Sequence, residues 1–487
     1  MTSAALSRRD GEPWWHAVTC RGFDQVPAVR LVAKVAALRR AEAMAWPILD
    51  TAIHVDLEAA GDGLGAPGSR TTLTGGRRWA LTMVHRDREH DCCAWARRLV
   101  DPAEPATVRL AGVDLAVEAM RAWRAAPSRL APTLADVLAE DSSVVRSAAA
   151  RALCASLTAT RVAADQLAEV LADPNLGATV ATALGSIGDH RAVPDLLRLL
   201  RTGDRVPRLG EALAAVAQAG ADPASLVTAA RQALARHGAS CRPGCTRRYC
   251  PAGPAMHLLA ALGPAAAGAV PDLLARLQSG MDRNDDGAPV FEIHVLERVG
   301  RAAEAAVPLL RRYAASGRSE SDVAVLALLM MTWDRVVADR FLAERPEQLR
   351  RCRIAPALVS WLVDHGGLTG RQHRQLRHLF TQPGAMQVRV AGALWRCDGP
   401  SVAGELLEEL PKYLDDDVFG PEALRVLAVM GEHARPVLDH LDRLVESRHR
   451  VAVHLGDADA EMRADESLVA AVVDAREQIA GSAAGRP

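Results

Sequence analysis

The strongest constraint on the fold of this chain is a segment of about twenty residues that recurs along the sequence. Each copy contains an apolar helix end, a glycine, a short linker, the dipeptide Val-Pro and a second apolar helix. The three clearest copies are ATALGSIGDHRAVPDLLRLL (181–200), LLAALGPAAAGAVPDLLARL (258–277) and VLERVGRAAEAAVPLLRRYA (295–314). An internal repeat of this size predicts stacked units, because such a chain grows by adding units and not by enlarging one core.

The glycine and the proline of each copy indicate where one helix ends and the next begins. Gly185, Gly263 and Gly300 are suited to the left-handed backbone conformation that commonly ends a helix. A proline follows each glycine after eight or nine residues. Proline is tolerated in the first turn of a helix, because its missing N–H has no helical partner there. The leucines that follow share one apolar helix face, so each copy predicts a helix–turn–helix.

Weaker copies of the same turn occur along most of the chain. The equivalent positions lie near residues 123, 154, 185, 218, 263, 300, 332, 362, 395 and 431. Most steps are about 30 to 37 residues, the size of one helical pair. Ala, Leu and Val supply most of the 49% apolar fraction, and Ala and Leu favour helix. We therefore predict an all-α α-solenoid of about ten helical pairs over residues 106–481.

Two of these stretches resemble the HEAT-repeat family. Leu184–Leu197 matches the pattern Leu-Gly-x-x-Gly-Asp-x-Arg-Ala-Val-Pro-x-Leu-Leu, and Val145–Leu153 looks like the second helix of a unit. The resemblance covers roughly Ala106 to Ile479 and is strongest to the short bacterial units called phycobilisome-lyase-like HEAT repeats. It implies an α-solenoid with a concave binding surface. It implies no single activity, because members range from scaffolds to a few enzymes.

The first hundred residues are less regular. Helices are predicted over Pro27–Trp46 and Arg77–Val100, with a loop rich in Gly, Ser and Thr over Gly61–Gly76. Within the second helix, the run His85–Trp95 is interpreted as a polar helix face with buried cysteines. Residues 1–105 are therefore predicted to form either an irregular helical cap, which repeat arrays need at their ends, or a separate small module.

One step of the repeat series, from 218 to 263, is about 45 residues and therefore too long. The excess predicts an inserted loop at residues 237–257. The loop carries three cysteines, Cys241, Cys245 and Cys250. With His257, or alternatively His237, three thiolates could close a tetrahedral Cys₃His zinc site. An iron–sulfur cluster and a loop without any metal are the alternatives.

Charge is distributed unevenly along the chain, although the formal net charge is only −1. Residues 345–396 contain nine Arg against two acidic residues, whereas residues 400–477 contain eighteen acidic and eight basic residues. Four basic side chains lie close to one helical stripe: Arg371, Arg374, Arg377 and His378. This stripe could bind phosphates or an acidic protein surface, or it could be a solvated helix face.

Motifs of catalysis are mostly absent. The sequence lacks G-x-x-x-x-G-K-[ST], G-x-S-x-G and H-E-x-x-H. It also lacks the His-Glu dipeptide that iron-dependent HEAT enzymes use to hold their metal. We therefore assign no catalytic residue and expect binding rather than catalysis.

The leading hypothesis is a HEAT-repeat scaffold that mediates protein–protein interaction through its concave surface. The first alternative is nucleic-acid binding through the Arg-rich region 345–396, and the second is a metal-binding function at Cys241–Cys250. Trp123, Trp333, Trp361 and Trp395 lie near repeat turns and are either contact residues or core residues.

The cellular location is predicted from the cysteines and the apolar runs. Nine cysteines without an N-terminal secretory signal indicate free thiols in a reducing compartment. No uncharged apolar run reaches the roughly 18 residues of a membrane span. We therefore expect a cytoplasmic protein without a membrane segment.

Overall fold

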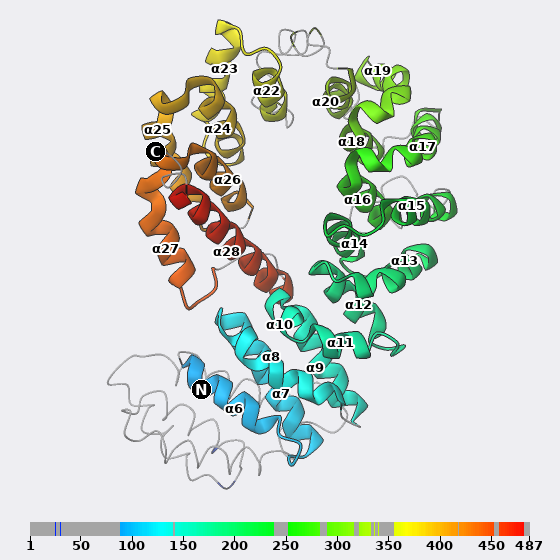
Figure 1. Ribbon diagram of the computed structural model, residues 1–487, viewed down its shortest axis with the longest axis vertical. Helices are drawn as coiled ribbons and strands as arrows, with labels where there is room; N and C mark the ends of the chain where they lie inside the picture. The colour runs from blue at the N-terminus through cyan, green and yellow to red at the C-terminus, as the bar shows by residue number, and fades with distance from the viewer. Residues whose placement is uncertain are drawn as a thin grey trace. The chain divides into compact units, whose positions relative to one another are not determined.

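The computed structural model describes most of the chain beyond residue 87. The described residues are 88–139, 142–237, 252–282, 290–315, 321–332, 355–416, 418–451 and 457–481, with single positions at 25, 30, 336 and 339. Within these ranges the regular elements are α-helices and short 3₁₀ helices (Figure 1). The predicted all-α solenoid is therefore confirmed. The predicted segments Pro27–Trp46 and Gly61–Gly76 lie outside the described residues.

The described helices form two compact units. Unit 1 contains Met1–Ala163 and the tripeptide Arg448–Arg450, and unit 2 contains Ala164–Ser447 and Val451–Pro487. The helices of unit 1 are α6 (Glu89–Leu99), α7 (Ala106–Ala122), α8 (Ala126–Asp136), α9 (Ser143–Ala155) and α10 (Leu157–Val162). α6 packs against α7 and α8, and α7 packs against α9, so the pairing of helices begins at α6 in the described part of the chain.

Unit 2 alternates between two rows of helices (Figure 1). The inner row contains α12 (Gly177–Ser186), α14 (Leu209–Gln218), α16 (Gly253–Leu262), α18 (Val290–Val299), α20 (Ser321–Thr332), α22 (Ala355–Asp364), α24 (Ala385–Asp398), α26 (Gly420–Met430) and α28 (Ala458–Gly481). The outer row contains α11 (Ala164–Glu169), α13 (Val193–Thr202), α15 (Pro223–His237), α17 (Val270–Asp282), α19 (Val307–Ala315), α23 (Gly370–Phe380), α25 (Ala403–Glu409) and α27 (Leu438–Glu446).

The predicted turns coincide with helix ends. Each of the ten predicted positions falls within three residues of the last residue of α7, α9 or an inner-row helix from α12 to α26. The predicted prolines also hold, because Pro194, Pro271 and Pro308 are each the second residue of an outer-row helix. The repeat period read from the sequence is therefore the period of the structure.

The glycine prediction is correct at two positions and wrong at the third. Gly263 and Gly300 have φ of 55° and 65°, as a residue that ends a helix requires. Gly185 is helical instead, and the positive φ of 79° belongs to Gly188, three residues later. Gly185 is needed for space, because a Cβ atom there would lie 2.6 Å from Cδ1 of Leu196.

Small residues let neighbouring inner-row helices approach closely. A Cβ atom on Gly210 of α14 would lie 2.9 Å from the Cβ of His257 on α16. In the outer row, by contrast, a groove separates α13 from α15. α12, α14, α16, α18 and α20 pack successively on one another in the inner row (Figure 1).

One apolar stretch, Gly253–Met281, is long and apolar enough to cross a membrane by length and composition. In the structure it consists of α16 and α17, separated by a 3₁₀ helix at Gly263–Ala269. Its leucines Leu258 and Leu273 are fully buried among neighbouring helices. The apolar residues of this stretch therefore belong to two helices that pack against their neighbours in the core.

Candidate partner-binding surfaces

The HEAT-like motif at Leu184–Leu197 forms a polar link to the preceding helix, α11, within unit 2. The carboxylate of Asp189 accepts a hydrogen bond from the backbone N–H of Arg191 and so caps the following turn. The guanidinium of Arg191 also donates to Asp189 and, at 2.7 Å, to Asp165 on α11. These hydrogen bonds from Arg191 lower the pKa of Asp189. The polar residues of this motif therefore support the array.

The inner row presents a continuous helical surface from α12 to α20. Its helices bury their Leu, Val and Ala side chains on one face and expose the opposite face. The exposed residues on that face include Gln218 of α14, His257 of α16, Arg298 of α18 and Met330 of α20. The surface is chemically mixed, with polar, basic and apolar side chains on successive helices.

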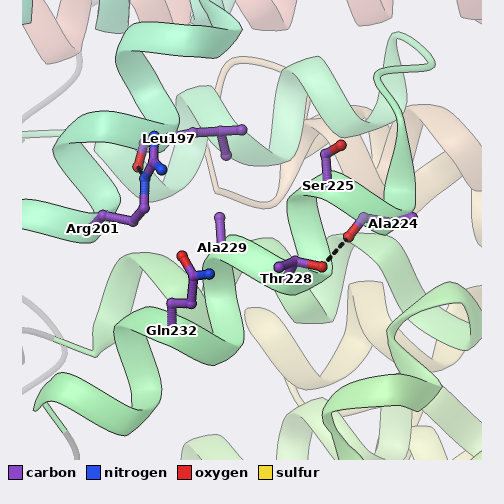
Figure 2. Close-up of a pocket in the computed structure, with 7 residues that line it drawn as sticks. All are labelled: Leu197, Arg201, Ala224, Ser225, Thr228, Ala229 and Gln232. Atoms are coloured by element: carbon purple, nitrogen blue, oxygen red, sulfur yellow. Dashed lines mark hydrogen bonds between the residues drawn. The ribbon is translucent and has the colours of Figure 1, made fainter.

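The outer row contains an open groove between α13 and α15 with a volume of about 390 Å³ (Figure 2). Seven residues line it: Leu197, Arg201, Ala224, Ser225, Thr228, Ala229 and Gln232. No feature of the sequence drew attention to these residues. The groove comes from the spacing of two helices that are adjacent in space and separated along the chain by α14.

α23 carries all four basic residues of the predicted stripe. The helix begins with a capping box, in which Oγ1 of Thr369 accepts from the backbone N–H of Gln372 and Oε1 of Gln372 accepts from the backbone N–H of Thr369. Leu376, Leu379 and Phe380 are buried. The buried face fixes which side chains of α23 point toward solvent.

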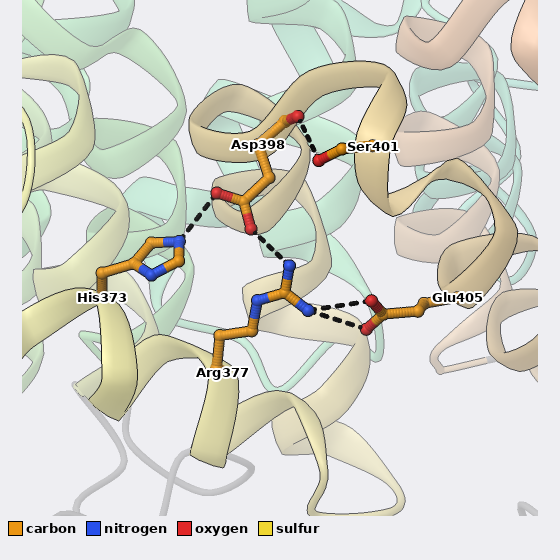
Figure 3. A network of polar contacts seen from close by, with 5 residues as sticks. All are labelled: His373, Arg377, Asp398, Ser401 and Glu405. Atoms are coloured by element: carbon orange, nitrogen blue, oxygen red, sulfur yellow. Dashed lines mark hydrogen bonds and ion pairs between the residues drawn. The ribbon is translucent and has the colours of Figure 1, made fainter.

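Arg377 binds two carboxylates of neighbouring helices (Figure 3). Its guanidinium lies 2.8 Å from Asp398 of α24 and 2.8 Å from Glu405 of α25. Nε2 of His373 lies 2.7 Å from the other carboxylate oxygen of Asp398. Hydrogen bonding to Glu405 raises the pKa of Arg377. Arg377 therefore joins three helices, whatever else it contacts.

The other three residues of the stripe are exposed. Arg371, Arg374 and His378 lie at i, i+3 and i+7, which places them on one face of α23. None of them forms an ion pair with another residue in the described part of the chain. Arg377 lies at i+6 from Arg371, which turns its side chain away from the face that the other three share. This spacing is the sequence signal that distinguishes Arg377 from them. Their role in partner binding stays a prediction.

The cysteine loop gives no geometry, because Cys241, Cys245 and Cys250 lie outside the described residues. The fourth predicted ligand, His257, is described and is exposed on α16. The described residues alone contain no group of three potential metal ligands. The zinc site stays a prediction.

Two of the candidate tryptophans are core residues. Trp123 is 3% exposed and Trp361 is 5% exposed, so neither offers its ring to a partner. Trp395 is partly exposed and lies against His433, with ring centroids 5.5 Å apart. Trp333 lies outside the described residues. Cys92 and Cys93 of α6 are buried, and burial raises the pKa of both thiols.

The alternating rows of paired helices define this chain as an α-solenoid protein. Residues 131–217 match the family model for HEAT repeats, so this stretch of the solenoid consists of HEAT repeats. The match does not distinguish the short bacterial, phycobilisome-lyase-like units, which stay a prediction. No curated protein matches the chain.

Several solved structures of Kap121p resemble the chain in three dimensions. Kap121p alone gives a TM-score of 0.48 at 11% identity, covering 96% of this chain and 63% of Kap121p. Kap121p bound to Pho4p gives 0.46 at 11% identity, covering 96% and 64%. The karyopherin Kap121p bound to the extreme C-terminus of the protein phosphatase Cdc14p gives 0.46 at 11% identity, covering 97% and 66%. The chain thus spans less than two thirds of the length of these proteins.

Proposed function

We propose that this HEAT-repeat protein is a scaffold that holds a protein partner against the inner row of unit 2. The observation that carries the proposal is the continuity of the inner-row surface. Successive helices from α12 to α20 pack directly on one another, so their exposed faces form one surface across five helices. A stable protein–protein interface engages roughly 20–30 residues on each side, and a surface of this extent can supply them.

The residue types on the inner row also favour a protein partner. Arg298 and Met330 belong to types that are enriched at protein interfaces. His257 and Gln218 add polar groups that can donate and accept hydrogen bonds. These four side chains are exposed to solvent and are therefore available to contact a partner.

The proposal is tested by photo-crosslinking in cells of the organism that encodes the chain. A photo-reactive amino acid is placed at Gln218 or at Arg298, both exposed on the inner row. The matched control places it at Arg311, which is exposed on α19 of the outer row. We expect the same protein to be captured from both inner-row positions and not from Arg311.

Two results would contradict the proposal. One is the absence of protein adducts at both inner-row positions in cells where the chain is expressed at its native level. The other is the capture of the same set of proteins from Gln218, Arg298 and Arg311, because contact without a preferred face is not recognition.

A further inference from the structure

The groove between α13 and α15 is a second, smaller surface with its own chemistry (Figure 2). Its volume of about 390 Å³ is at the small end of the roughly 300–1,000 Å³ typical of ligand pockets. From Ala224 to Gln232 it follows two turns of α15, or about 12 Å at 1.5 Å per residue. A strand rises about 3.3 Å per residue, so the groove accommodates roughly four residues of extended chain.

One end of the groove offers hydrogen-bond acceptors. Oγ of Ser225 donates its hydrogen to Oδ2 of Asp222. Oγ1 of Thr228 donates its hydrogen to the backbone carbonyl of Ala224 at 2.8 Å (Figure 2). A hydroxyl has one hydrogen and two acceptor lone pairs. With both hydrogens already used, Ser225 and Thr228 can only accept from a ligand.

The other end of the groove offers hydrogen-bond donors. Nε of Arg201 donates to the carbonyl of Leu197 at 3.1 Å, which leaves its two terminal nitrogens to donate elsewhere. The side-chain amide of Gln232 is exposed and has no hydrogen-bond partner among the described residues. A guanidinium and an amide together suit a carboxylate, because charge-assisted hydrogen bonds are the strong ones.

A second arginine lies next to Arg201 at the donor end. Two nearby arginines are already paired, Arg198 with Asp195 and Arg231 with Asp272. Arg201 and Arg236 form no ion pair within the described ranges, and the nearest acidic group along the chain, Asp204, accepts a hydrogen bond from Thr202. Arg236 donates to the backbone carbonyl of Arg201, which brings it to the same end of the groove. The surplus of positive charge is therefore local to Arg201.

We propose that this groove binds a short acidic segment of a protein partner in an extended conformation. The carboxylate of an Asp or Glu side chain is held by Arg201 and Gln232. Backbone N–H groups of the segment donate to Ser225 and Thr228, and an apolar side chain packs against Leu197 and Ala229.

The same groove chemistry disfavours nucleic acid. Phosphate oxygens are acceptors and would face the acceptor oxygens of Ser225 and Thr228. The seven lining residues include no aromatic ring on which a base could stack. A peptide, in contrast, supplies both N–H donors and a carboxylate.

The experiment measures fluorescence anisotropy with a labelled acidic peptide of alternating Leu and Glu. The same peptide with Lys in place of Glu and a single-stranded oligothymidine serve as comparison probes. The full-length chain is tested as wild type and as Arg201→Glu, Arg201→Lys and the control Arg311→Glu. Arg311 is exposed on α19 and lies outside the groove lining.

We expect the acidic peptide to bind wild type more tightly than the Lys peptide does. Arg201→Glu should weaken its binding at least about tenfold, because a charge-assisted contact is lost and a like charge is introduced. Arg201→Lys should retain part of the affinity, and Arg311→Glu should retain all of it. Circular dichroism confirms that each variant is folded.

The proposal is overturned if Arg201→Glu binds the acidic peptide as wild type does, or if the peptide does not bind at all. Preferential binding of the oligothymidine that depends on Arg201 would overturn it too. The groove lies on the outer row, whereas the crosslinking test of the scaffold proposal uses inner-row positions. A negative result in the peptide experiment would therefore leave the inner-row crosslinks unchanged. The two proposals can therefore fail separately.

Discussion

The carboxylate of Glu89 in α6 is held by Arg448, a residue 359 positions further along the chain, at 3.1 Å. Arg129 of α8 approaches the other carboxylate oxygen at 2.8 Å, and the Glu89 side chain is only 3% exposed. Around this contact, the backbone N–H of Arg124 donates to the carbonyl of Arg448. Trp123 and His449 form an isolated β-bridge. Residues 448–450 are thus an integral part of unit 1.

This arrangement predicts that Glu89→Gln destabilises unit 1. The substitution keeps the shape of the side chain but removes the charge that both arginines approach. Losing hydrogen bonds to a buried charged group should lower the free energy of unfolding by about 1–3 kcal/mol. Hydrogen exchange of α6 to α9 measures the effect.

Asp91→Asn is the matched control for Glu89→Gln. Asp91 lies on the same helix, is partly exposed and, among the described residues, pairs with Arg88 at 3.4 Å. Exposed pairs contribute about 0–1 kcal/mol, so this variant should exchange nearly as wild type does. Equal protection in the two variants would show that the Glu89 cluster does not stabilise unit 1.

Close approach of inner-row helices predicts that Gly210→Ala is destabilising. The new Cβ would lie 2.9 Å from Cβ of His257 and 3.2 Å from Cα of Pro254, and atoms this close to the backbone cannot rotate away. Overpacking of this kind costs about 1–3 kcal/mol, which exceeds the gain of roughly 1 kcal/mol in helix propensity. Urea unfolding measures the net change.

Gly404→Ala is the matched control, and we expect it to stabilise the protein. Gly404 is exposed on α25, and a Cβ there would meet no atom within 4 Å. Helix propensity then acts alone, and the variant should be more stable by up to about 1 kcal/mol. If Gly210→Ala were as stabilising as Gly404→Ala, α14 and α16 would have room for a Cβ atom at Gly210, contrary to the close contact with His257.

The polar contact between α11 and the turn at Asp189, both within unit 2, predicts a pH-dependent effect. Hydrogen bonds from Arg191 lower the pKa of Asp189 from its ordinary value of 3.8. The stabilisation is therefore complete above that value and is lost as the pH falls through the lowered pKa of the folded state. Asp189→Asn should lower stability at neutral pH and make little difference in strong acid.

Asparagine is a useful replacement at Asp189 because it caps helices about as well as aspartate. The comparison of aspartate with asparagine therefore measures the effect of the carboxylate charge, because the capping hydrogen bond is kept in both. Urea unfolding of wild type and Asp189→Asn at pH 7 and at successively lower pH, down to the point where the carboxylates are protonated, gives the difference at each pH. A difference that stays the same over this whole range would mean that the carboxylate charge is not what stabilises this turn.

Most of the fold could be predicted from the sequence because its determinants are local. A glycine, a following Val-Pro and an apolar period lie within about twenty residues, and together they placed ten turns. The misplaced glycine shows the limit of local signals. Gly185 and Gly188 are both glycines of the same motif, and only contact with Leu196 shows that Gly185 provides space and not a turn.

The candidate surfaces depend on contacts between distant residues and were less predictable. Arg377 was grouped with a basic stripe, but its partners Asp398 and Glu405 are 21 and 28 positions away. The groove between α13 and α15 has no signature at all, because it arises from the spacing of two outer-row helices. Periodicity identifies which face of a helix is polar, but it does not identify which residues of other helices lie next to that face.

The exposed stripe of α23 allows a direct test of the nucleic-acid alternative. Arg371→Glu combined with Arg374→Glu reverses two exposed charges and leaves the Arg377 network intact. If the stripe binds phosphates, wild type should bind duplex DNA at low salt with a steep salt dependence, and the double variant should bind more weakly with a shallower slope. Absence of DNA binding by wild type at low salt would remove this alternative.

The cysteine loop predicts a measurable metal content. If Cys241, Cys245 and Cys250 bind zinc together with a histidine, anaerobically purified protein should contain about one zinc per chain by elemental analysis, because structural thiolate sites bind zinc tightly. Cys245→Ser should lose the metal, whereas Cys154→Ser, at a buried cysteine of α9, should retain it. Less than about 0.2 equivalents of zinc or iron in wild type would rule out a thiolate site of ordinary affinity.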